Sequence, residues 1–336
     1  MFRIAVDAFN LIADRRGMGR HVRQILGQWS RETDIDVSLI VRDPQHVAPL
    51  RSEFPFEVRS LSESANEPFD AVWYPWNGIR FDLDARKVVT MYDAFAFEHP
   101  HRSWIARRRE QAPIRRAARE ADALATLTRW SAAQIARCLH LDPQRLTLVG
   151  AACDPFWQPS GETADAQPYI FFLGGPEPRK NAGLLFDAFA RAFGDRRVRL
   201  IVGGTLNQRD ERRLREAPFA HERVRPDDPT LRALYGGALA VAVPSYDEGF
   251  GLPAIEAMAC GAPVLAADAA ALPEACDGAA LLLSSRDAGA WALALARVAR
   301  DRALRDDLRA RSLARIARLD RAAPARITLE LLRRSL

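Results

Sequence analysis

Short apolar runs alternate with longer amphipathic segments along most of this chain. Apolar runs that predict strands lie at residues 2–8, 37–42, 56–61, 70–74, 87–91, 122–128, 145–150, 169–173, 198–203, 237–244, 262–266 and 281–283. Helices are predicted at residues 20–30, 102–121, 129–139, 181–193, 229–235 and 253–260, and from residue 288 onward. Strands this short and rich in Val, Ile, Leu and Phe, separated by segments that can cross over, predict parallel sheets. The predicted fold class is therefore α/β, with doubly wound parallel sheets.

The chain is long enough for two domains of this kind. Its 336 residues, of which 48% are hydrophobic, can bury two ordinary cores. Residues 159–168 combine Pro, Ser, Gly, Glu, Thr and Asp, a composition typical of a linker. We therefore predict an N-terminal domain at residues 1–160, a C-terminal domain at 161–318, and a last helical segment at 319–336.

One stretch of the second domain carries most of the candidate chemistry. It reads Ser-Tyr-Asp-Glu-Gly-Phe-Gly-Leu-Pro-Ala-Ile-Glu-Ala-Met-Ala-Cys-Gly and spans residues 245–261. Pro253 suits the first residue of a helix, so Glu248 is expected in the preceding loop and Glu256 in the first helical turn. The N–H groups and the dipole at such a helix start can hold an anion such as a diphosphate. The alternative is a buried strand–loop–helix unit whose acidic residues only complement the dipole.

A pair of cations precedes another predicted helix. An apolar strand ends near Gly174, and Arg179 and Lys180 stand just before the helix at residues 181–193. Of the 48 basic residues, only Lys87 and Lys180 are lysines. A planar guanidinium beside a compact ammonium suits a diphosphate. The alternative is a charge pair at a helix start that binds no ligand.

Candidate residues in the first domain also follow predicted strands. Gly17 and Gly19 form a Gly-rich turn between the first strand and the first helix, where doubly wound sheets place phosphate. An ordinary tight turn is an equal alternative. The run Val-Val-Thr-Met-Tyr-Asp ends a later strand with Tyr92 and Asp93.

These motifs together resemble those of the retaining nucleotide-sugar glycosyltransferases of family 4. The longest match is Pro-Ser-x-x-Glu-Gly-Phe-Gly-Leu-Pro-x-x-Glu-Ala-Met-Ala-x-Gly-x-Pro-Val, which begins at Pro244. Residues 174–181 are similar to the family's Gly-x4-Arg/Lys-Lys-Asn pattern, and Gly-Met-Gly-Arg-His-Val is similar to its Gly-Ile-Gly-Arg-Tyr segment. One strand end departs from the family, because Tyr92 precedes Asp93 where the family usually has His-Asp.

The resemblance implies a B-type glycosyltransferase fold, in which two Rossmann-like domains face each other across a cleft. It also implies that the last helix, in residues 319–336, crosses back to the N-terminal domain. It implies that Arg179 and Lys180 neutralise the leaving diphosphate, that Glu248 binds donor-sugar hydroxyls and that Glu256 binds the ribose diol. It also implies a catalytic role for Asp93, and no metal or other cofactor, since the nucleotide sugar is a substrate. The donor-binding set is completed by Gly17, Gly19, Gly174, Gly249, Phe250, Gly251 and Leu252, with Tyr92 and Arg225 as further candidates.

The activity implied by the resemblance is transfer of a sugar to an acceptor hydroxyl with retention, by front-face attack. The first-domain segment favours a GDP-linked, mannose-like donor, a glycan or lipid-linked glycan acceptor, and a role in cell-surface polysaccharide or lipopolysaccharide assembly. Two alternatives stay open. One is a sugar phosphorylase or epimerase on the same fold. The other is a non-catalytic nucleotide-sugar-binding subunit, which Tyr92 suggests because a phenol is no general base near neutral pH.

Composition and charge indicate where such a protein works. The four cysteines show no paired metal-ligand spacing, which predicts reduced thiols in a cytoplasmic protein. The first residues, Met-Phe-Arg-Ile-Ala-Val-Asp, predict a strand start rather than a signal peptide, and the sequence contains no apolar run of about eighteen residues. The net charge is +5, and the basic residues are spread without a readout motif, which argues against specific nucleic-acid binding. The Arg-rich segment 102–121, with Pro113 as a break or kink, predicts either a solvated helix or a peripheral contact with anionic membrane.

Overall fold

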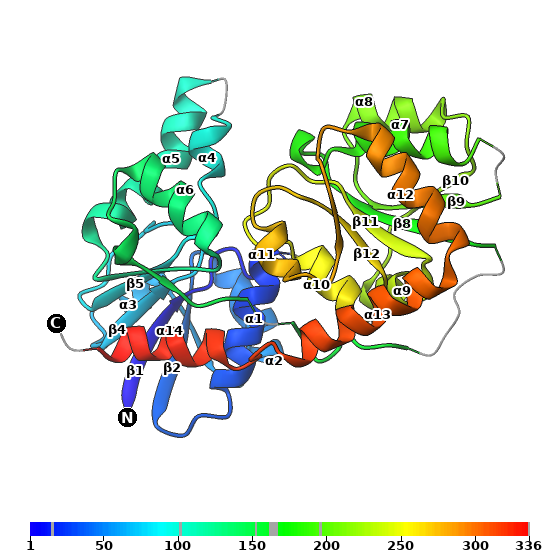
Figure 1. Ribbon diagram of the computed structural model, residues 1–336. Helices are drawn as coiled ribbons and strands as arrows, with labels where there is room; N and C mark the ends of the chain where they lie inside the picture. The colour runs from blue at the N-terminus through cyan, green and yellow to red at the C-terminus, as the bar shows by residue number, and fades with distance from the viewer. Residues whose placement is uncertain (15–16, 101–102, 152, 161–166, 195–196, 335–336) are drawn as a thin grey trace. The chain divides into compact units, whose positions relative to one another are not determined.

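The structure is a computed structural model, and it describes residues 1–336 except 15–16, 101–102, 152, 161–166, 195–196 and 335–336. The chain divides into two compact units (Figure 1). The first unit holds residues 1–152 together with residues 320–336, and the second holds residues 153–319.

Both units are built on a parallel sheet, as the apolar runs predict. The strands of the first unit are β1 (Phe2–Asp7), β2 (Ile35–Val41), β3 (Glu57–Ser60), β4 (Ala71–Tyr74), β5 (Arg86–Thr90), β6 (Ala123–Thr126) and β7 (Leu146–Leu148). Those of the second unit are β8 (Tyr169–Gly174), β9 (Arg199–Gly204), β10 (His221–Val224), β11 (Ala240–Val243), β12 (Val264–Ala267) and β13 (Leu281–Leu283). The strand orders are β3-β2-β1-β4-β5-β6-β7 and β10-β9-β8-β11-β12-β13. The predicted α/β class is confirmed.

Helices cover the sheets of both units (Figure 1). Those of the first unit are α1 (Met18–Trp29), α2 (Val47–Glu53), α3 (Leu61–Ser64), α4 (Phe95–Glu98), α5 (Trp104–Glu120), α6 (Arg129–Leu139) and α14 (Ala323–Arg333). Those of the second unit are α7 (Ala182–Ala192), α8 (Gln208–Arg215), α9 (Asp228–Gly237), α10 (Leu252–Ala259), α11 (Leu272–Cys276), α12 (Ala288–Arg300) and α13 (Arg302–Ala317). Short 3-10 turns lie at Pro44–His46, Pro143–Arg145 and Pro178–Lys180.

The C-terminal helix α14 packs in the first unit, although it follows the second unit in sequence. The indole of Trp29 in α1 donates to the carbonyl of Ala325 at 3.1 Å. Arg86 of β5 donates to the carbonyl of Leu331 at 3.0 Å. The helix therefore fills part of one face of the first sheet.

The first unit ends earlier than the linker composition suggests. Residues 153–160 belong to the second unit, not to the N-terminal domain as expected. Trp157 is buried in the core of the second unit and lies 5.9 Å, ring to ring, from Tyr235 of α9. Burial of a large aromatic side chain outweighs the local Pro-rich composition in placing this segment.

Two local features differ from the expectations. Pro113 lies inside α5, which runs unbroken from Trp104 to Glu120. The carbonyl of Pro113 accepts a hydrogen bond from the Ile79 N–H at 3.1 Å, so the neighbouring loop packs against the helix at this point.

Strand β10 was not predicted, because its burial is only partial and its sequence, His-Glu-Arg-Val, is polar.

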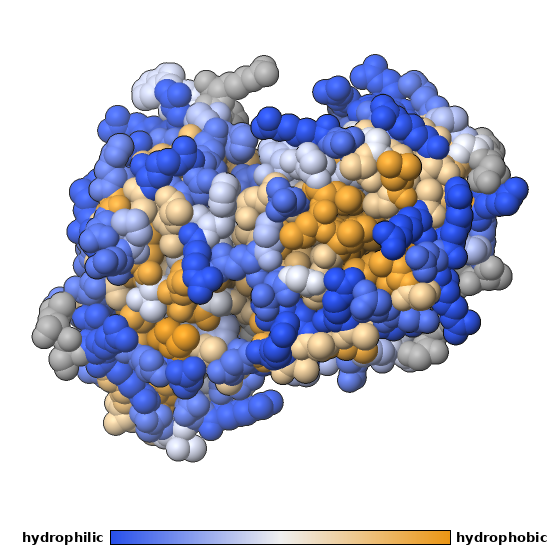
Figure 2. Space-filling model, in the orientation of Figure 1, coloured by the Kyte–Doolittle hydropathy of each residue, from blue (hydrophilic) through white to orange (hydrophobic). Residues whose placement is uncertain are grey.

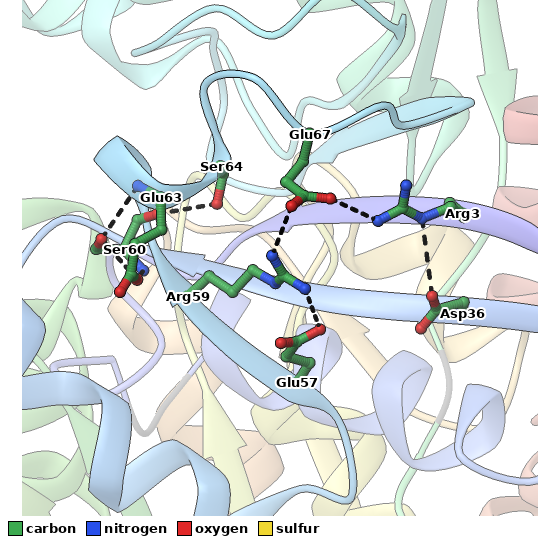
Figure 3. A network of polar contacts seen from close by, with 8 residues as sticks. All are labelled: Arg3, Asp36, Glu57, Arg59, Ser60, Glu63, Ser64 and Glu67. Carbon is green, nitrogen blue, oxygen red and sulfur yellow. Dashed lines mark hydrogen bonds and ion pairs between the residues drawn. The ribbon is translucent and has the colours of Figure 1, made fainter.

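Ion pairs join the amino-terminal ends of the strands in the first sheet (Figure 3). Arg3 of β1 lies 2.9 Å from Glu67 and 3.8 Å from Asp36. Arg59 lies 3.1 Å from Glu67 and 2.7 Å from Glu57. The carboxylates are partly exposed, so each pair stabilises the fold only modestly. This network lies at the edge opposite to the strand ends that carry the candidate residues.

The surface of the second unit is partly apolar over its last strand. Figure 2 shows apolar side chains gathered there, and the three leucines of β13 are half-buried at the edge of the sheet. Within the described ranges, every helix is too short or too polar to span a bilayer.

Candidate functional site

The candidate cations and Glu248 meet at the carboxyl edge of the second sheet. Strand β8 has β9 on one side and β11 on the other, so the loops after β8 and β11 lie at a topological switch point, where open α/β sheets bind ligands. The guanidinium of Arg179 donates to Oε2 of Glu248 at 3.1 Å. The ammonium of Lys180 donates to Oε1 of the same carboxylate at 2.7 Å. The structure therefore brings together three residues predicted from two separate motifs.

This cluster is largely shielded from solvent. The side chains of Arg179, Lys180 and Glu248 are 22%, 15% and 8% exposed. Burial alone would raise the pKa of Glu248, but the charges of Lys180 and then Arg179, with hydrogen bonds from Lys180 and Ser245, hold that pKa below its usual value. Glu248 is therefore an ionised carboxylate at neutral pH.

Backbone contacts hold the two loops against each other. Asn181 adopts a left-handed conformation with φ of 56°, and its amide donates to the carbonyls of Pro244 and Ser285 at 3.0 and 2.9 Å. The N–H of Tyr246 donates to the carbonyl of Arg179 at 3.0 Å. Arg179 also donates to the carbonyl of Asp247 at 3.1 Å. Asn181, the last residue of the Gly-x4-Arg/Lys-Lys-Asn match, thus helps to position Arg179 and Lys180.

Two glycines fit this arrangement for steric reasons. Gly251 has φ of 91° and precedes α10, and a Cβ on it would lie 2.7 Å from the Leu272 side chain. A Cβ on Gly175 would lie 2.4 Å from the Glu177 carboxylate and 3.1 Å from Cγ of Lys180. The Lys180 side chain therefore runs directly over Gly175, with no space beneath it.

Glu256 is not in the first turn of α10, which corrects the expectation. The helix begins at Leu252, one residue before Pro253, because Gly251 takes the left-handed conformation at its N-cap. Glu256 is 4% exposed, and the hydroxyl of Tyr235 donates to its Oε2 at 3.5 Å. The carboxylate therefore lies beside α9.

The other predicted donor-binding residues are spread around this loop. Gly249, Phe250 and Leu252 are half-buried, while Gly251 and Gly174 are buried. Arg225 is exposed in the connection between β10 and α9. Gly174 and residues 249–252 are thus close in sequence to the cluster of Arg179, Lys180 and Glu248, whereas Arg225 lies on another loop.

The switch point of the first sheet carries a buried carboxyl group that sequence reasoning missed. Asp7 ends β1 and is 0% exposed. Its Oδ1 accepts from the Phe9 N–H at 3.0 Å, while its Oδ2 has no hydrogen-bond partner among the described residues. Burial raises the pKa of Asp7 to about 7, against the Phe9 hydrogen bond and the charges of Arg80 and Arg42. An aspartate at the end of an apolar strand was the available signal.

A second buried polar pair lies between α1 and the end of β5. The rings of His21 and Tyr92 meet edge to face, with centroids 5.5 Å apart. Both side chains are buried, and neither the His21 nitrogens nor the Tyr92 hydroxyl has a hydrogen-bond partner in the described part of the chain. Burial lowers the pKa of His21 to about 4, and burial followed by Asp14 raises that of Tyr92 well above its usual value. The pair is therefore uncharged at neutral pH.

The remaining candidates of the first unit have structural contacts. Oδ1 of Asp93 accepts from the Phe95 N–H at 3.1 Å at the start of α4. Gly17 has φ of 46° at the N-cap of α1, and a Cβ on Gly19 would lie 1.9 Å from the Asp14 carbonyl oxygen. Arg15 and Arg16 of this turn lie outside the described residues. Among the residues described, no group of three or more His, Cys, Asp or Glu side chains is placed to hold a metal ion.

Comparison with protein families and curated proteins gives partial matches. A family model described as glycosyl transferases group 1 matches residues 167–301. O-antigen chain mannosyltransferase B of Escherichia coli is 29% identical over 266 residues, which cover 72% of this chain and 69% of that protein. D-inositol 3-phosphate glycosyltransferase of Mycolicibacterium smegmatis is 36% identical over 194 residues, which cover 52% of this chain and 44% of that protein. The chain thus matches less than half the length of the second relative.

Solved structures match along nearly the whole chain. Anabaena HepE in complex with UDP and glucose has a TM-score of 0.77 at 14% identity, and the match covers 99% of each chain. WaaG, described as a glycosyltransferase involved in lipopolysaccharide biosynthesis, has a TM-score of 0.74 at 15% identity and covers 98% of this chain and 99% of its own. At these identities the likeness shows the fold alone, and it confirms the predicted B-type fold of two parallel-sheet units.

Proposed function

We propose that this chain, which belongs to the group 1 glycosyl transferases, moves a sugar from a nucleotide diphosphate sugar to an acceptor hydroxyl with retention of configuration. The observation that carries the proposal is the double contact of Glu248 with Arg179 and Lys180 at a sheet switch point. A ligand bound there would meet two cations and an ionised carboxylate within one rigid cluster.

The charges of this cluster suit a diphosphate leaving group. Two positive charges and one negative charge leave a net positive site, and the loop of Glu248 runs into the start of α10. Negative charge grows on the diphosphate as the bond to the sugar breaks, and cations already fixed in place stabilise that charge without reorganisation. We assign the leaving diphosphate to Arg179 and Lys180.

Carboxylate oxygens accept hydrogen bonds from sugar hydroxyls. Glu248 is ionised and held by its two cations, so it can orient the donor sugar without moving. We assign the ribose diol to Glu256 and the remaining donor contacts to Gly174 and residues 249–252. Gly17, Gly19 and Asp93 are proposed to contribute from the first unit, with Tyr92 and Arg225 as further contacts.

Retention by double displacement requires a carboxylate nucleophile. We assign no residue to that role and instead propose front-face attack. In this step the acceptor oxygen bonds to the anomeric carbon, the bond from that carbon to the phosphate oxygen breaks, and the acceptor proton passes to the leaving phosphate. No metal or other cofactor is proposed.

The donor and the acceptor are proposed from likeness. The turn at Gly17 and Gly19, and the name of the E. coli relative, favour a GDP-linked mannose and a role in surface-glycan assembly. HepE is also known in complex with UDP-glucose, which makes UDP-glucose the second donor to test. A lipid-linked acceptor would bring the protein to the inner face of the cytoplasmic membrane, and Trp104 and Ile105, which are 64% and 53% exposed at the start of α5, support such a peripheral contact.

Thermal unfolding with GDP, UDP, ADP and dTDP tests the donor site. All four nucleotides are compared at one concentration. A nucleotide present at a hundred times its dissociation constant should stabilise the protein by about 2.7 kcal/mol, and one that binds more weakly should stabilise it less, so the four can be ranked. The matching nucleotide sugars should then give a glycosylated product only when an acceptor is present. A protein that responds to none of the nucleotides, or that consumes the donor without transferring the sugar, would contradict the proposal.

A further inference from the structure

A hollow of about 620 Å³ opens on the first unit, on residues that the proposed donor site does not use. Its walls come from α4, α5 and the end of α6, and they include Phe97, Arg107, Gln111, Arg115, Arg137 and His140. None of the described lining residues is acidic. The hollow is therefore a cationic site separate from the cluster around Glu248.

The helix α5 presents this charge from one face. Arg107, Gln111 and Arg115 are spaced four residues apart, so their side chains lie along the same side of the helix. Gln111 donates to the carbonyl of Ala96 at 2.7 Å, which fixes that side against α4. The guanidinium of Arg115 lies 4.9 Å from the centre of the Phe97 ring. The wall of the hollow thus combines two arginines with an aromatic face.

The positive charge here is only partly compensated. Glu98 of α4 pairs with Arg137 and offsets one of the three arginines. Arg107 and Arg115 have no carboxylate within ion-pair distance in the described ranges. By contrast, Arg116 on the neighbouring side of α5 is paired with Asp82 and Glu120 at 2.8 and 2.6 Å. Two uncompensated guanidinium groups therefore face the hollow.

We propose that this hollow binds a phosphate ester. Guanidinium groups recognise phosphate through paired hydrogen bonds, and two of them suit its charge. The volume exceeds what a single phosphate fills, and the Phe97 ring offers an apolar surface to the group that carries the phosphate. The same chemistry is found in a soluble sugar or glycerol phosphate and in a phospholipid headgroup.

The test uses the full chain carrying R179Q and K180Q, so that phosphate bound at the proposed donor site is not counted. Calorimetric titration with glycerol 3-phosphate should then report the hollow alone. Adding R107Q and R115Q should weaken binding at least tenfold. The control adds R108Q and R119Q, which remove the same charge from exposed positions of α5 that do not line the hollow, and it should change the affinity less than threefold.

An equal loss in both variants would show diffuse attraction to a basic helix and would overturn the proposal, as would a lack of glycerol 3-phosphate binding in the starting protein. Flotation with phosphatidylglycerol vesicles, against phosphatidylcholine vesicles, assigns the source. If R107Q and R115Q abolish vesicle binding as well, the ligand is a lipid headgroup. If they abolish only glycerol 3-phosphate binding, it is a free phosphate ester. Because the donor site is already disabled, none of these results depends on the proposed transferase activity.

Discussion

The switch points of the two sheets each hold a buried carboxyl group, and the pKa values of the two groups are shifted in opposite directions. Asp7 ends β1 in the first unit, and Glu248 follows β11 in the second. Burial is the largest influence on both, and in both it disfavours the charged form. The pKa of Asp7 nevertheless rises to about 7, while that of Glu248 stays below its usual value.

The difference lies in the partners. Glu248 touches Lys180 at 2.7 Å and Arg179 at 3.1 Å, so direct ion pairs offset the cost of removing its charge from water. Arg80 and Arg42 act on Asp7 only through longer-range attraction, which does not offset that cost. Similar positions in two similar sheets therefore give one carboxylate that is charged at neutral pH, Glu248, and one carboxyl group that takes up a proton near pH 7, Asp7.

The largest expected effect comes from removing the charge of Glu248. Glu248→Gln keeps the shape of the side chain, but it ends the ionic contact with both cations. We expect kcat/KM to fall about a hundredfold, equal to about 2.7 kcal/mol, because the donor sugar loses its charged acceptor. Nucleoside diphosphate affinity should hold or increase, since the cations lose a competing carboxylate. Steady-state kinetics and calorimetry measure the two quantities separately.

Glu216→Gln is the matched control, because Glu216 is an exposed carboxylate at the end of α8. It should leave both quantities unchanged. If Glu248→Gln transferred sugar as fast as the parent, Glu248 would serve only to hold the cations, and the sugar-binding role would be wrong.

The second effect concerns the pH dependence of stability at Asp7. Because its folded pKa of about 7 lies above the ordinary aspartate value of 3.8, this group stabilises the fold fully below about pH 4 and loses that contribution as the pH rises to about 7. Each pH unit in this window should cost about 1.4 kcal/mol of unfolding free energy. Between pH 5 and 7 the parent should therefore lose roughly 2 kcal/mol more than Asp7→Asn, which cannot ionise. Denaturant unfolding of both proteins at several pH values checks this. If the unfolding free energies of the parent and of Asp7→Asn changed equally with pH, burial would not raise the pKa of Asp7.

The charged cluster and most strands could be predicted from the sequence, whereas the edge strand β10 could not. The meeting of Glu248 with Arg179 and Lys180 follows from topology, because loops after neighbouring parallel strands share one edge of a sheet. The apolar runs likewise predicted most strands, since buried parallel strands are continuously hydrophobic. The edge strand β10 escaped detection, because its Glu222 is exposed and pairs with Arg199 of β9. A polar edge strand carries no such pattern.

The buried polar residues of the first unit, Asp7 and His21, could not be predicted from the sequence around them for another reason. Asp7 and His21 are both buried, but their burial depends on residues distant in the sequence. Strand β1, which Asp7 ends, pairs with β2 and β4, and the His21 ring meets that of Tyr92. Pro113 gives the same lesson, because a tertiary hydrogen bond from Ile79 accompanies its place inside α5. Motifs predict which residues carry charge, whereas the ionisation of a residue depends on neighbours distant in the sequence.

The third effect tests whether the charged site needs a lysine or any cation. Lys180→Arg keeps the charge, but the longer side chain must pass over Gly175, where even a Cβ would lie 3.1 Å from Cγ of Lys180. We expect kcat/KM to fall at least about tenfold, equal to about 1.4 kcal/mol. Lys87→Arg is the control, since Lys87 pairs with the exposed Asp82 at 2.9 Å on the first unit. Equal activity of both variants would mean that charge alone is required at position 180.

The smallest effect is expected at the buried pair of His21 and Tyr92, from Tyr92→Phe. The Tyr92 hydroxyl is buried and makes no hydrogen bond to any described residue, so its removal breaks no contact that the structure shows. The ring itself stays against His21, and the Tyr92 carbonyl keeps its hydrogen bond from Ser131 at 2.7 Å. We expect activity within about threefold of the parent and an unfolding free energy that is equal or up to about 1 kcal/mol higher, since an unpaired buried hydroxyl is costly. Asp93→Ala is the comparison and should lose more, because it removes the acceptor for the Phe95 N–H at the start of α4. Were Tyr92→Phe as inactive as Glu248→Gln, with its stability intact, the hydroxyl would have to act directly on the substrate, and the two sheet edges would contribute equally to the chemistry.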